Sequence, residues 1–153
     1  MIRIKRVYDP PSADDGERFL VDRLWPRGLT RSAARLDGWL KDLAPSGALR
    51  RWFHADTSQW VEFCRRYRRE LRRHSEALAA LKRKSARGAV TLLYAAHDRE
   101  RNHAVVLREV IRGRHRRVGG AAPVKLHIGH EHRALDPLDG DRASGVGWSN
   151  RKL

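Results

Sequence analysis

Three short stretches of the chain have hydrophobic patterns that predict β-strands. In "IRIKRVY", apolar Ile2 and Ile4 alternate with basic residues, which predicts a strand with one buried face. The stretch "RFLVDRLW" is a second strand candidate, and Pro26 and Gly28 end it because neither residue continues a β-ladder well. The stretch "AVTLLYAA" is apolar throughout and rich in β-formers, as expected of a central strand that is covered on both faces.

Apolar residues recur with helical spacing after the second strand. Positions i, i+3, i+4 and i+7 of "TRSAARLDGWLKDLAPS" are apolar, namely Leu36, Trp39, Leu40 and Leu43. This spacing predicts an amphipathic helix that Pro45 ends. Ser46 can cap a short following helix, "GALRRWF".

The longest predicted element is a helix from about Thr57 to about Lys84. Asp56 and Gln59 resemble a capping box at its start, and Gly88 is a plausible stop. Arginines fall mostly off its apolar stripe: Arg65, Arg66, Arg68, Arg69, Arg72 and Arg73. Glu62 and Glu70 lie within one turn of several of these arginines, so pairing within the helix accounts for part of the charge.

The order of these elements predicts an α/β fold. After "AVTLLYAA" comes a polar loop, and then "NHAVVLREVI", which reads as a helix capped by Asn102, so that strand, loop and helix form half of a βαβ unit. We expect a small single domain over residues 1–112, built as a three-layer sheet with flanking helices and one long basic helix. Residues 113–153 show no sustained period and many Gly, Pro and Asp, and we expect a basic, irregular and mobile tail.

Length and composition agree with one folded domain in a reducing compartment. A chain of 153 residues, 41% hydrophobic and 33% charged, is long enough to bury a core. It has no apolar run of the roughly 18 residues that span a bilayer, and its first residues lack the apolar core of a signal peptide. The single cysteine, Cys64, excludes an internal disulfide. We therefore expect a cytoplasmic protein without membrane contact.

The net charge of +15 favours salt-sensitive association with nucleic acid or another polyanion. Most of the basic residues are arginines scattered along the chain, and such a composition also arises from nucleotide bias in a genome. Charge alone therefore indicates a partner class and no binding groove.

Five stretches together resemble a known family. They are "VDRLWPRG", "LDGWLKDLAPS", "LRRWFHAD", "WVEFCRRYRREL" and "VTLLYAAHDRERNHAVVL". In their order and spacing they are similar to the family of domains of unknown function numbered 488 (DUF488), in its short YeaO-like branch. The resemblance covers about residues 1–112 and implies a small α/β domain without an established reaction. Some members carry labels as transcriptional regulators, and a lysine is common in the family where this chain has His97.

Two polar loops follow the predicted strands and suggest a ligand site. In open α/β sheets, ligands bind beyond the carboxyl ends of the strands. If the strands that end near Val21 and Tyr94 are parallel neighbours, their two loops meet there. The ligand-binding candidates are Arg23, Trp25, Arg27 and Asn102, and the catalytic candidates are Asp22, Asp98 and His103. Arginines and a helix start would bind a small phosphorylated or carboxylated ligand, a class that includes nucleotide-like molecules, and the sequence leaves any cofactor unknown.

Four alternatives remain open from the sequence. The two loops could form a purely structural clasp of opposite charges, with Trp25 packed as core. The protein could instead regulate or bind nucleic acid through Arg65, Arg66, Arg69, Arg72 and Arg73. It could bind a protein partner through exposed tryptophans. Near the C-terminus, His127, His130 and His132 are weak metal-ligand candidates, because no scaffold supports them.

Overall fold

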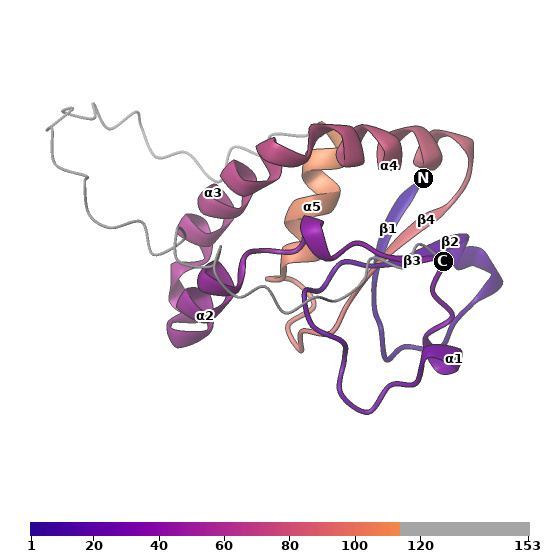
Figure 1. The fold of residues 1–153 in the computed structure, drawn as a ribbon, viewed down its shortest axis with the longest axis horizontal. Helices are drawn as coiled ribbons and strands as arrows, with labels where there is room; N and C mark the ends of the chain where they lie inside the picture. The colour runs from indigo at the N-terminus through magenta and orange to yellow at the C-terminus, as the bar shows by residue number, and fades with distance from the viewer. Residues whose placement is uncertain (114–153) are drawn as a thin grey trace, which may run out of the picture.

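A four-stranded, fully parallel sheet organises the chain, and the computed structural model describes residues 1–113 (Figure 1). The strands are β1 (Ile2–Arg6), β2 (Glu17–Leu20), β3 (Gly38–Trp39) and β4 (Val90–Tyr94), in the order β1-β4-β2-β3. All five residues of β4 are buried, and this strand pairs with β1 on one side and β2 on the other. The predicted α/β fold and the predicted central strand are both confirmed.

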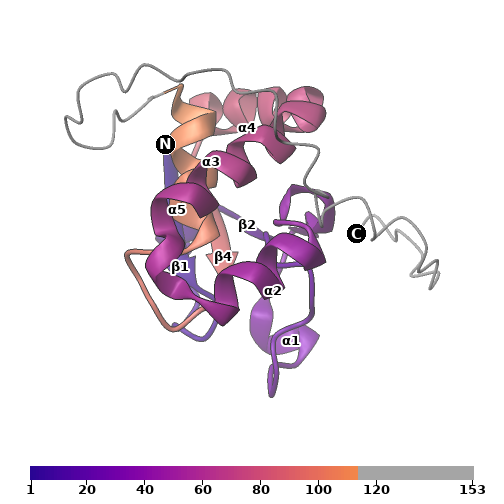
Figure 2. The same cartoon turned by 90° about the vertical axis from the view of Figure 1, so that its left-hand side faces the viewer.

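Four helices lie on one side of the sheet, and α4 and α5 pack directly on its strands (Figures 1 and 2). They are α2 (Gly47–Ala55), α3 (Trp60–Leu71), α4 (Ser75–Arg87) and α5 (His103–Arg112). Helix α5 packs on β1 and β4 and also contacts α3 and α4. Val90, Leu92 and Tyr94 point to this face, because side chains of a strand alternate between the two sides of the sheet.

The opposite face is covered by a loop that carries one short helix, α1 (Arg31–Ala34). Leu20 and Leu93 are fully buried there, and Trp25, Leu36 and Trp39 pack against them. The sheet is therefore flanked on both sides, by a helical layer and by this thinner layer.

The predicted helix caps are in place. The Ser46 hydroxyl accepts a hydrogen bond from the Leu49 N–H (3.1 Å) at the start of α2. The Asn102 side chain does the same for the Val105 N–H (3.1 Å) at the start of α5. Gly88 follows the last residue of α4.

The long basic helix is continuous in sequence but changes direction. Helical residues run from the 3-10 turn η3 (Thr57–Gln59) through α3, a second 3-10 turn η4 (Arg72–His74) and α4. Figure 1 shows α3 and α4 meeting at an angle at η4. The tighter turn of a 3-10 segment is a common place for such a bend.

The amphipathic helix predicted from Leu36 to Leu43 is wrong. Helix α1 ends at Ala34, because the left-handed backbone of the next residue, Arg35 (φ 47°), cannot continue a helix. Asp37 then binds the backbone of Arg18 twice. The Arg18 N–H donates to the Asp37 carboxylate (2.7 Å), and the Asp37 N–H donates to the Arg18 carbonyl (2.8 Å). Trp39 joins the sheet beside Leu20 as β3, and a 3-10 turn, η2 (Lys41–Leu43), follows. Pairing with β2 has overridden the local helical pattern.

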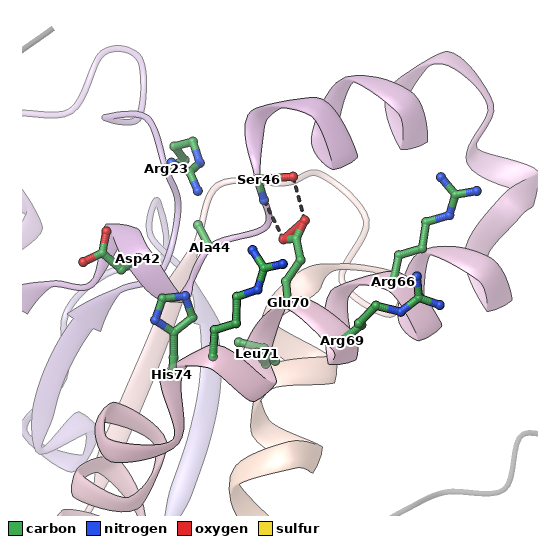
Figure 3. A pocket seen from close by; sticks show the side chains of 10 residues that line it. Arg23, Asp42, Ala44, Ser46, Arg66, Arg69, Glu70, Leu71 and His74 are labelled. Atoms are coloured by element: carbon green, nitrogen blue, oxygen red, sulfur yellow. Dashed lines mark hydrogen bonds between the residues drawn. The ribbon is translucent and has the colours of Figure 1, made fainter. Parts of the chain in front are cut away.

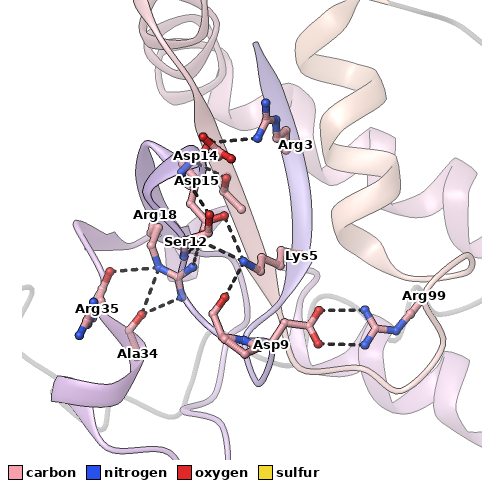
Figure 4. A network of polar contacts seen from close by, with 12 residues as sticks. Arg3, Lys5, Asp9, Ser12, Asp14, Asp15, Arg18, Ala34, Arg35 and Arg99 are labelled. Carbon is pink, nitrogen blue, oxygen red and sulfur yellow. Dashed lines mark hydrogen bonds and ion pairs between the residues drawn. The ribbon is translucent and has the colours of Figure 1, made fainter.

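A buried polar network fixes the start of β2. Arg18 is 4% exposed, and Asp15, in the 3-10 turn η1 (Ala13–Asp15), is 5% exposed. The Asp15 carboxylate forms ion pairs with Arg18 and with Lys5 (3.1 Å; Figure 4). The Asp15 carbonyl accepts a hydrogen bond from the Thr91 hydroxyl (2.7 Å). Burial alone would raise the pKa of Asp15, but hydrogen bonds from the Ser12 N–H, Lys5 and Arg18 outweigh it and lower the pKa below 3.8.

The two edges of the sheet are each protected, in different ways. Strand β3 has only two residues. At the other edge, Arg3 and Lys5 project from β1, and the Arg112 guanidinium occupies the outward carbonyl of Ile2 (2.8 Å). Basic side chains on an edge strand oppose pairing with another chain.

Two findings bear on the other sequence-based expectations. Within residues 1–113, every helix is too short or too polar to cross a bilayer. The predicted tail beyond Gly113 lies outside the described residues, and so do its candidate metal ligands His127, His130 and His132.

We expect Asp15→Asn to lower the free energy of unfolding by roughly 3 kcal/mol at pH 7, because it leaves the buried Arg18 and the half-buried Lys5 without their carboxylate. The folded-state pKa of Asp15 is lowered, so its contribution is full above pH 3.8 and falls as pH drops through the folded pKa. Urea unfolding of both proteins at pH 7 and pH 3 should therefore show a smaller difference at pH 3. The control is Asp14→Asn, whose exposed side chain should matter little. Equal effects of the two changes would refute the role of the network.

Candidate functional site

The two predicted loops do meet at the carboxyl ends of β2 and β4, which are parallel neighbours. Asp22 follows β2 and approaches His103 at the start of α5, with Oδ1 2.8 Å from Nε2. The other Asp22 oxygen accepts a hydrogen bond from the Ala95 N–H (3.0 Å), just after β4. Asp22 therefore joins three elements at this end of the sheet.

The geometry around His103 defines how its ring is used. Its Nε2 lies 3.1 Å from the Val21 carbonyl as well as 2.8 Å from Asp22 Oδ1. Both neighbours are acceptors, so Nε2 carries a hydrogen. The Asp22 Oδ1 atom is buried and has no well-aligned hydrogen bond, so its contact with His103 is a close approach of 2.8 Å. The Tyr67 ring packs edge-on against His103 at 6.3 Å.

Asp98 and Asn102 are engaged in local backbone contacts. Asp98 is exposed, and its Oδ1 accepts from the N–H groups of Glu100 and Arg101 (both 2.9 Å). The backbone N–H of Arg101 makes the largest contribution to lowering the pKa of Asp98. Asn102 is buried, and its amide donates to the Asp98 carbonyl (2.9 Å) while capping α5. These contacts shape the loop before α5.

The residues of "LWPRG" point in different directions. Trp25 packs on the sheet, donates to the Leu29 carbonyl (2.7 Å) and meets the Trp39 ring edge-on at 5.4 Å. Arg27 is exposed, and its carbonyl accepts from the Tyr8 hydroxyl (2.8 Å). Arg23 turns toward the Pro45 carbonyl (3.1 Å), on the side of the sheet that carries α3.

Arg23 thereby reaches a hollow that the sequence did not predict. We call it the arginine cleft, with a volume of about 190 Å³ (Figure 3). It lies between the end of β2, the segment from η2 to α2, and the polar side of α3 and η4. Its lining consists of Arg23, Asp42, Ala44, Ser46, Arg66, Arg69, Glu70, Leu71, Arg73 and His74. Of the predicted ligand-binding residues, Arg23 lines this cleft, while Trp25, Arg27 and Asn102 do not.

The cleft carries more positive than negative charge. Four arginines and two carboxylates line it, which leaves an excess of two positive charges before His74 is counted. Arg66 is held by Glu62 (3.1 Å) and lies over the Trp52 ring at 4.3 Å. Neither Arg69 nor Arg73 forms an ion pair with any carboxylate in residues 1–113. Their guanidinium groups are exposed and available to an anion.

The cleft joins two groups of residues that the sequence analysis treated as alternatives. Arg66, Arg69 and Arg73 were proposed to contact nucleic acid, and they share the cleft with Arg23. Arg65 pairs loosely with Glu62 (3.5 Å) and Arg72 is exposed, and both lie outside the cleft.

Asp42 and His74 are lining residues that sequence reasoning missed. The sequence does contain a pattern for the wall formed by α3 and η4. The spacing i, i+3, i+4 and i+7 places four polar residues on one side of a helix, namely Arg66, Arg69, Glu70 and Arg73. Asp42 could not be placed, because it stood in a segment predicted to be helical.

Cys64 and Tyr67 belong to the core. Cys64 is 8% exposed, and burial raises the pKa of its thiol to about 11. Burial likewise raises the pKa of the Tyr67 hydroxyl well above its usual range, and this hydroxyl donates to the Leu43 carbonyl. Neither group is poised for nucleophilic or acid–base chemistry. Within the described residues, no group of three or more His, Cys, Asp or Glu side chains could hold a metal ion.

Comparison with known proteins gives a family match and similar relatives. Residues 1–125 match a family model described as "Inactive DUF488-N3 subclade". An uncharacterized protein of Mycobacterium tuberculosis (strain H37Rv) is 42% identical over 113 residues, which are 74% of this chain and 95% of that relative. The uncharacterized protein YeaO of Escherichia coli (strain K12) is 41% identical over 111 residues, which are 72% and 96% of the two chains. No solved structure matches the chain.

We expect Asp22→Asn to destabilise the protein by about 1–3 kcal/mol. In one orientation the new amide N–H₂ would face the N–H of His103, and in the other orientation it would replace the acceptor of the Ala95 N–H. Asp98→Asn is the matched control: it makes the same chemical change in an exposed loop and keeps an acceptor for both N–H groups. Urea unfolding of the two variants measures the difference. Equal stability of both variants would show that the Asp22–His103 contact contributes little.

Proposed function

Because the chain belongs to the DUF488 family, in the subclade described as inactive, we propose that it is a binding module and not a catalyst. Its ligand is an anion that carries a phosphate group, and the arginine cleft is the binding site. The observation that carries this proposal is the convergence of Arg23 with Arg66, Arg69 and Arg73 around one hollow. Arginine suits this role because its planar guanidinium binds phosphate oxygens in pairs.

The volume of the cleft limits what can enter it. Pockets that enclose drug-sized ligands usually measure roughly 300–1,000 Å³, whereas the cleft measures about 190 Å³. A phosphate group fits this volume, while the rest of a nucleotide or phosphosugar would lie outside on the rim. The exposed guanidinium groups of Arg69 and Arg73 are placed to contact a ligand that enters from solvent.

The arrangement of the acid–base candidates within residues 1–113 supports binding without reaction. Asp22 and His103, the strongest acid–base candidates, contact each other and do not line the cleft. The Ser46 hydroxyl donates to Glu70 (2.6 Å) and accepts from the Leu49 N–H, so its function as a helix cap occupies it. A nucleophile needs a base that can take its proton and a geometry free to attack.

A nucleic-acid backbone is a second source of the same phosphate chemistry. Arg65 and Arg72 are exposed beside the cleft and could contact neighbouring phosphates of a strand. The net charge of +15 supports this candidate, but such binding should weaken steeply with salt. A free phosphorylated ligand held by several arginines in a hollow should be less sensitive.

The test is isothermal titration calorimetry with inorganic phosphate, ribose 5-phosphate and a short single-stranded oligonucleotide. We expect the double variant Arg23→Gln/Arg73→Gln to weaken binding at least tenfold, since each lost charge-assisted hydrogen bond is worth about 1.5–3 kcal/mol. The matched control, Arg83→Gln/Arg87→Gln, removes the same charge from α4, outside the cleft.

The two double variants separate a site from general charge. Binding that falls in the cleft variant and persists in the control supports the proposal. Equal losses in both variants, or loss of all binding between 50 and 200 mM salt, would mean that net charge alone attracts the ligand. If only the oligonucleotide binds, the nucleic-acid candidate replaces the small ligand.

A further inference from the structure

Glu70 is a carboxylate in the wall of a cleft whose charge is otherwise mostly positive. It lies on α3 between Arg69 and Leu71 and points toward Ser46 (Figure 3). A carboxylate repels an anion unless the anion can donate a hydrogen to it. The presence of Glu70 therefore bears on which anions the cleft accepts.

Two hydrogen bonds from Ser46 hold the Glu70 carboxylate in place. The Ser46 N–H donates to one carboxylate oxygen (2.8 Å) and its hydroxyl donates to the other (2.6 Å). Ser46 is itself fixed as the cap of α2, a helix of nine residues. Since Glu70 lies on α3 and Ser46 caps α2, the two hydrogen bonds hold the carboxylate in one orientation.

The carboxylate keeps unused acceptor capacity. An ionised carboxylate has about four lone-pair sites. The two hydrogen bonds from Ser46 use two of them, and no cation in residues 1–113 forms an ion pair with Glu70. Glu70 lines the cleft, so the remaining sites are available to a donor on a bound molecule.

We propose that Glu70 makes the arginine cleft selective for oxyanions that bring their own hydrogen-bond donor. This inference rests on the proposed function. Hydrogen phosphate and phosphate monoesters with a nearby hydroxyl have such a donor at neutral pH, whereas sulfate has none. The arginines attract all of these anions. Glu70 accepts a hydrogen bond from hydrogen phosphate or from the phosphate monoester, and it repels sulfate.

The test compares phosphate with sulfate, two tetrahedral anions of similar size, by calorimetry at pH 7 and constant ionic strength. We expect the wild-type protein to bind phosphate at least tenfold more tightly than sulfate. Glu70→Gln keeps the shape of the side chain but removes its charge and adds an N–H₂ donor. The ratio of the two affinities should therefore fall to about threefold or less, mainly through tighter binding of sulfate.

The control is Glu76→Gln, the same change at an exposed position of α4 outside the cleft, which should keep the wild-type ratio. Circular dichroism confirms that each variant is folded. Equal affinities of the wild-type protein for the two anions would overturn the inference even if Glu70→Gln does not fold. An unchanged ratio in folded Glu70→Gln would overturn it too.

The outcomes also distinguish this inference from the proposed function. If neither anion, nor ribose 5-phosphate, binds the wild-type protein, the proposed function as a binding module for a small phosphorylated ligand fails. If both anions bind the wild-type protein equally and binding depends on Arg23 and Arg73, the function stands and Glu70 has no selective role.

Discussion

The buried guanidinium of Arg18 is the constraint on which the arrangement of the first half of the chain depends. A guanidinium has five N–H donors, no acceptor and a permanent charge, so burial requires oxygen atoms on all sides. In this protein the acceptors are the Asp15 carboxylate and the carbonyls of Ala34 (2.9 Å) and Arg35 (3.2 Å). The chain has to turn at Arg35 so that the carbonyls of Ala34 and Arg35 both reach the guanidinium. After this turn, Asp37 pairs with the backbone of Arg18.

The cleft is a consequence of that turn. Trp39 is paired beside β2, and the chain after it passes the carboxyl end of β2. Ser46 is thereby placed next to α3. There Ser46 meets Glu70, and Arg23 reaches the Pro45 carbonyl from the other side. The three walls of the cleft are thus held by contacts between residues more than twenty positions apart in sequence.

The sequence was informative where a pattern depends on local physics. The apolar run of β4, the caps Ser46 and Asn102, and the stop at Gly88 each reflect hydrogen bonding or burial within a few residues, and all were predicted correctly. The apolar pattern around Trp39 was misleading. Trp39 packs on one face of the sheet and Leu40 packs into the core on the other face, and together they give an apolar spacing that resembles a helix. From one sequence, such a short strand cannot be distinguished from one side of an amphipathic helix.

The candidate site was predictable only in part for a similar reason. The approach of Asp22 to His103 followed from the topology, because parallel neighbours end at the same edge. The direction of Arg23 did not follow from any pattern. Its side chain leaves the loop for a carbonyl whose position depends on the unpredicted strand β3.

The two protected edges of the sheet have a consequence for how the molecule meets other chains. An intruding strand would find only two residues of β3 on one side, and on the other side β1, with basic side chains and an outward carbonyl occupied by Arg112. Growth of the sheet into a larger assembly is therefore disfavoured within the described part of the chain. Encounters between copies have to go through side chains, and a formal charge of +15 keeps like molecules apart unless a polyanion bridges them.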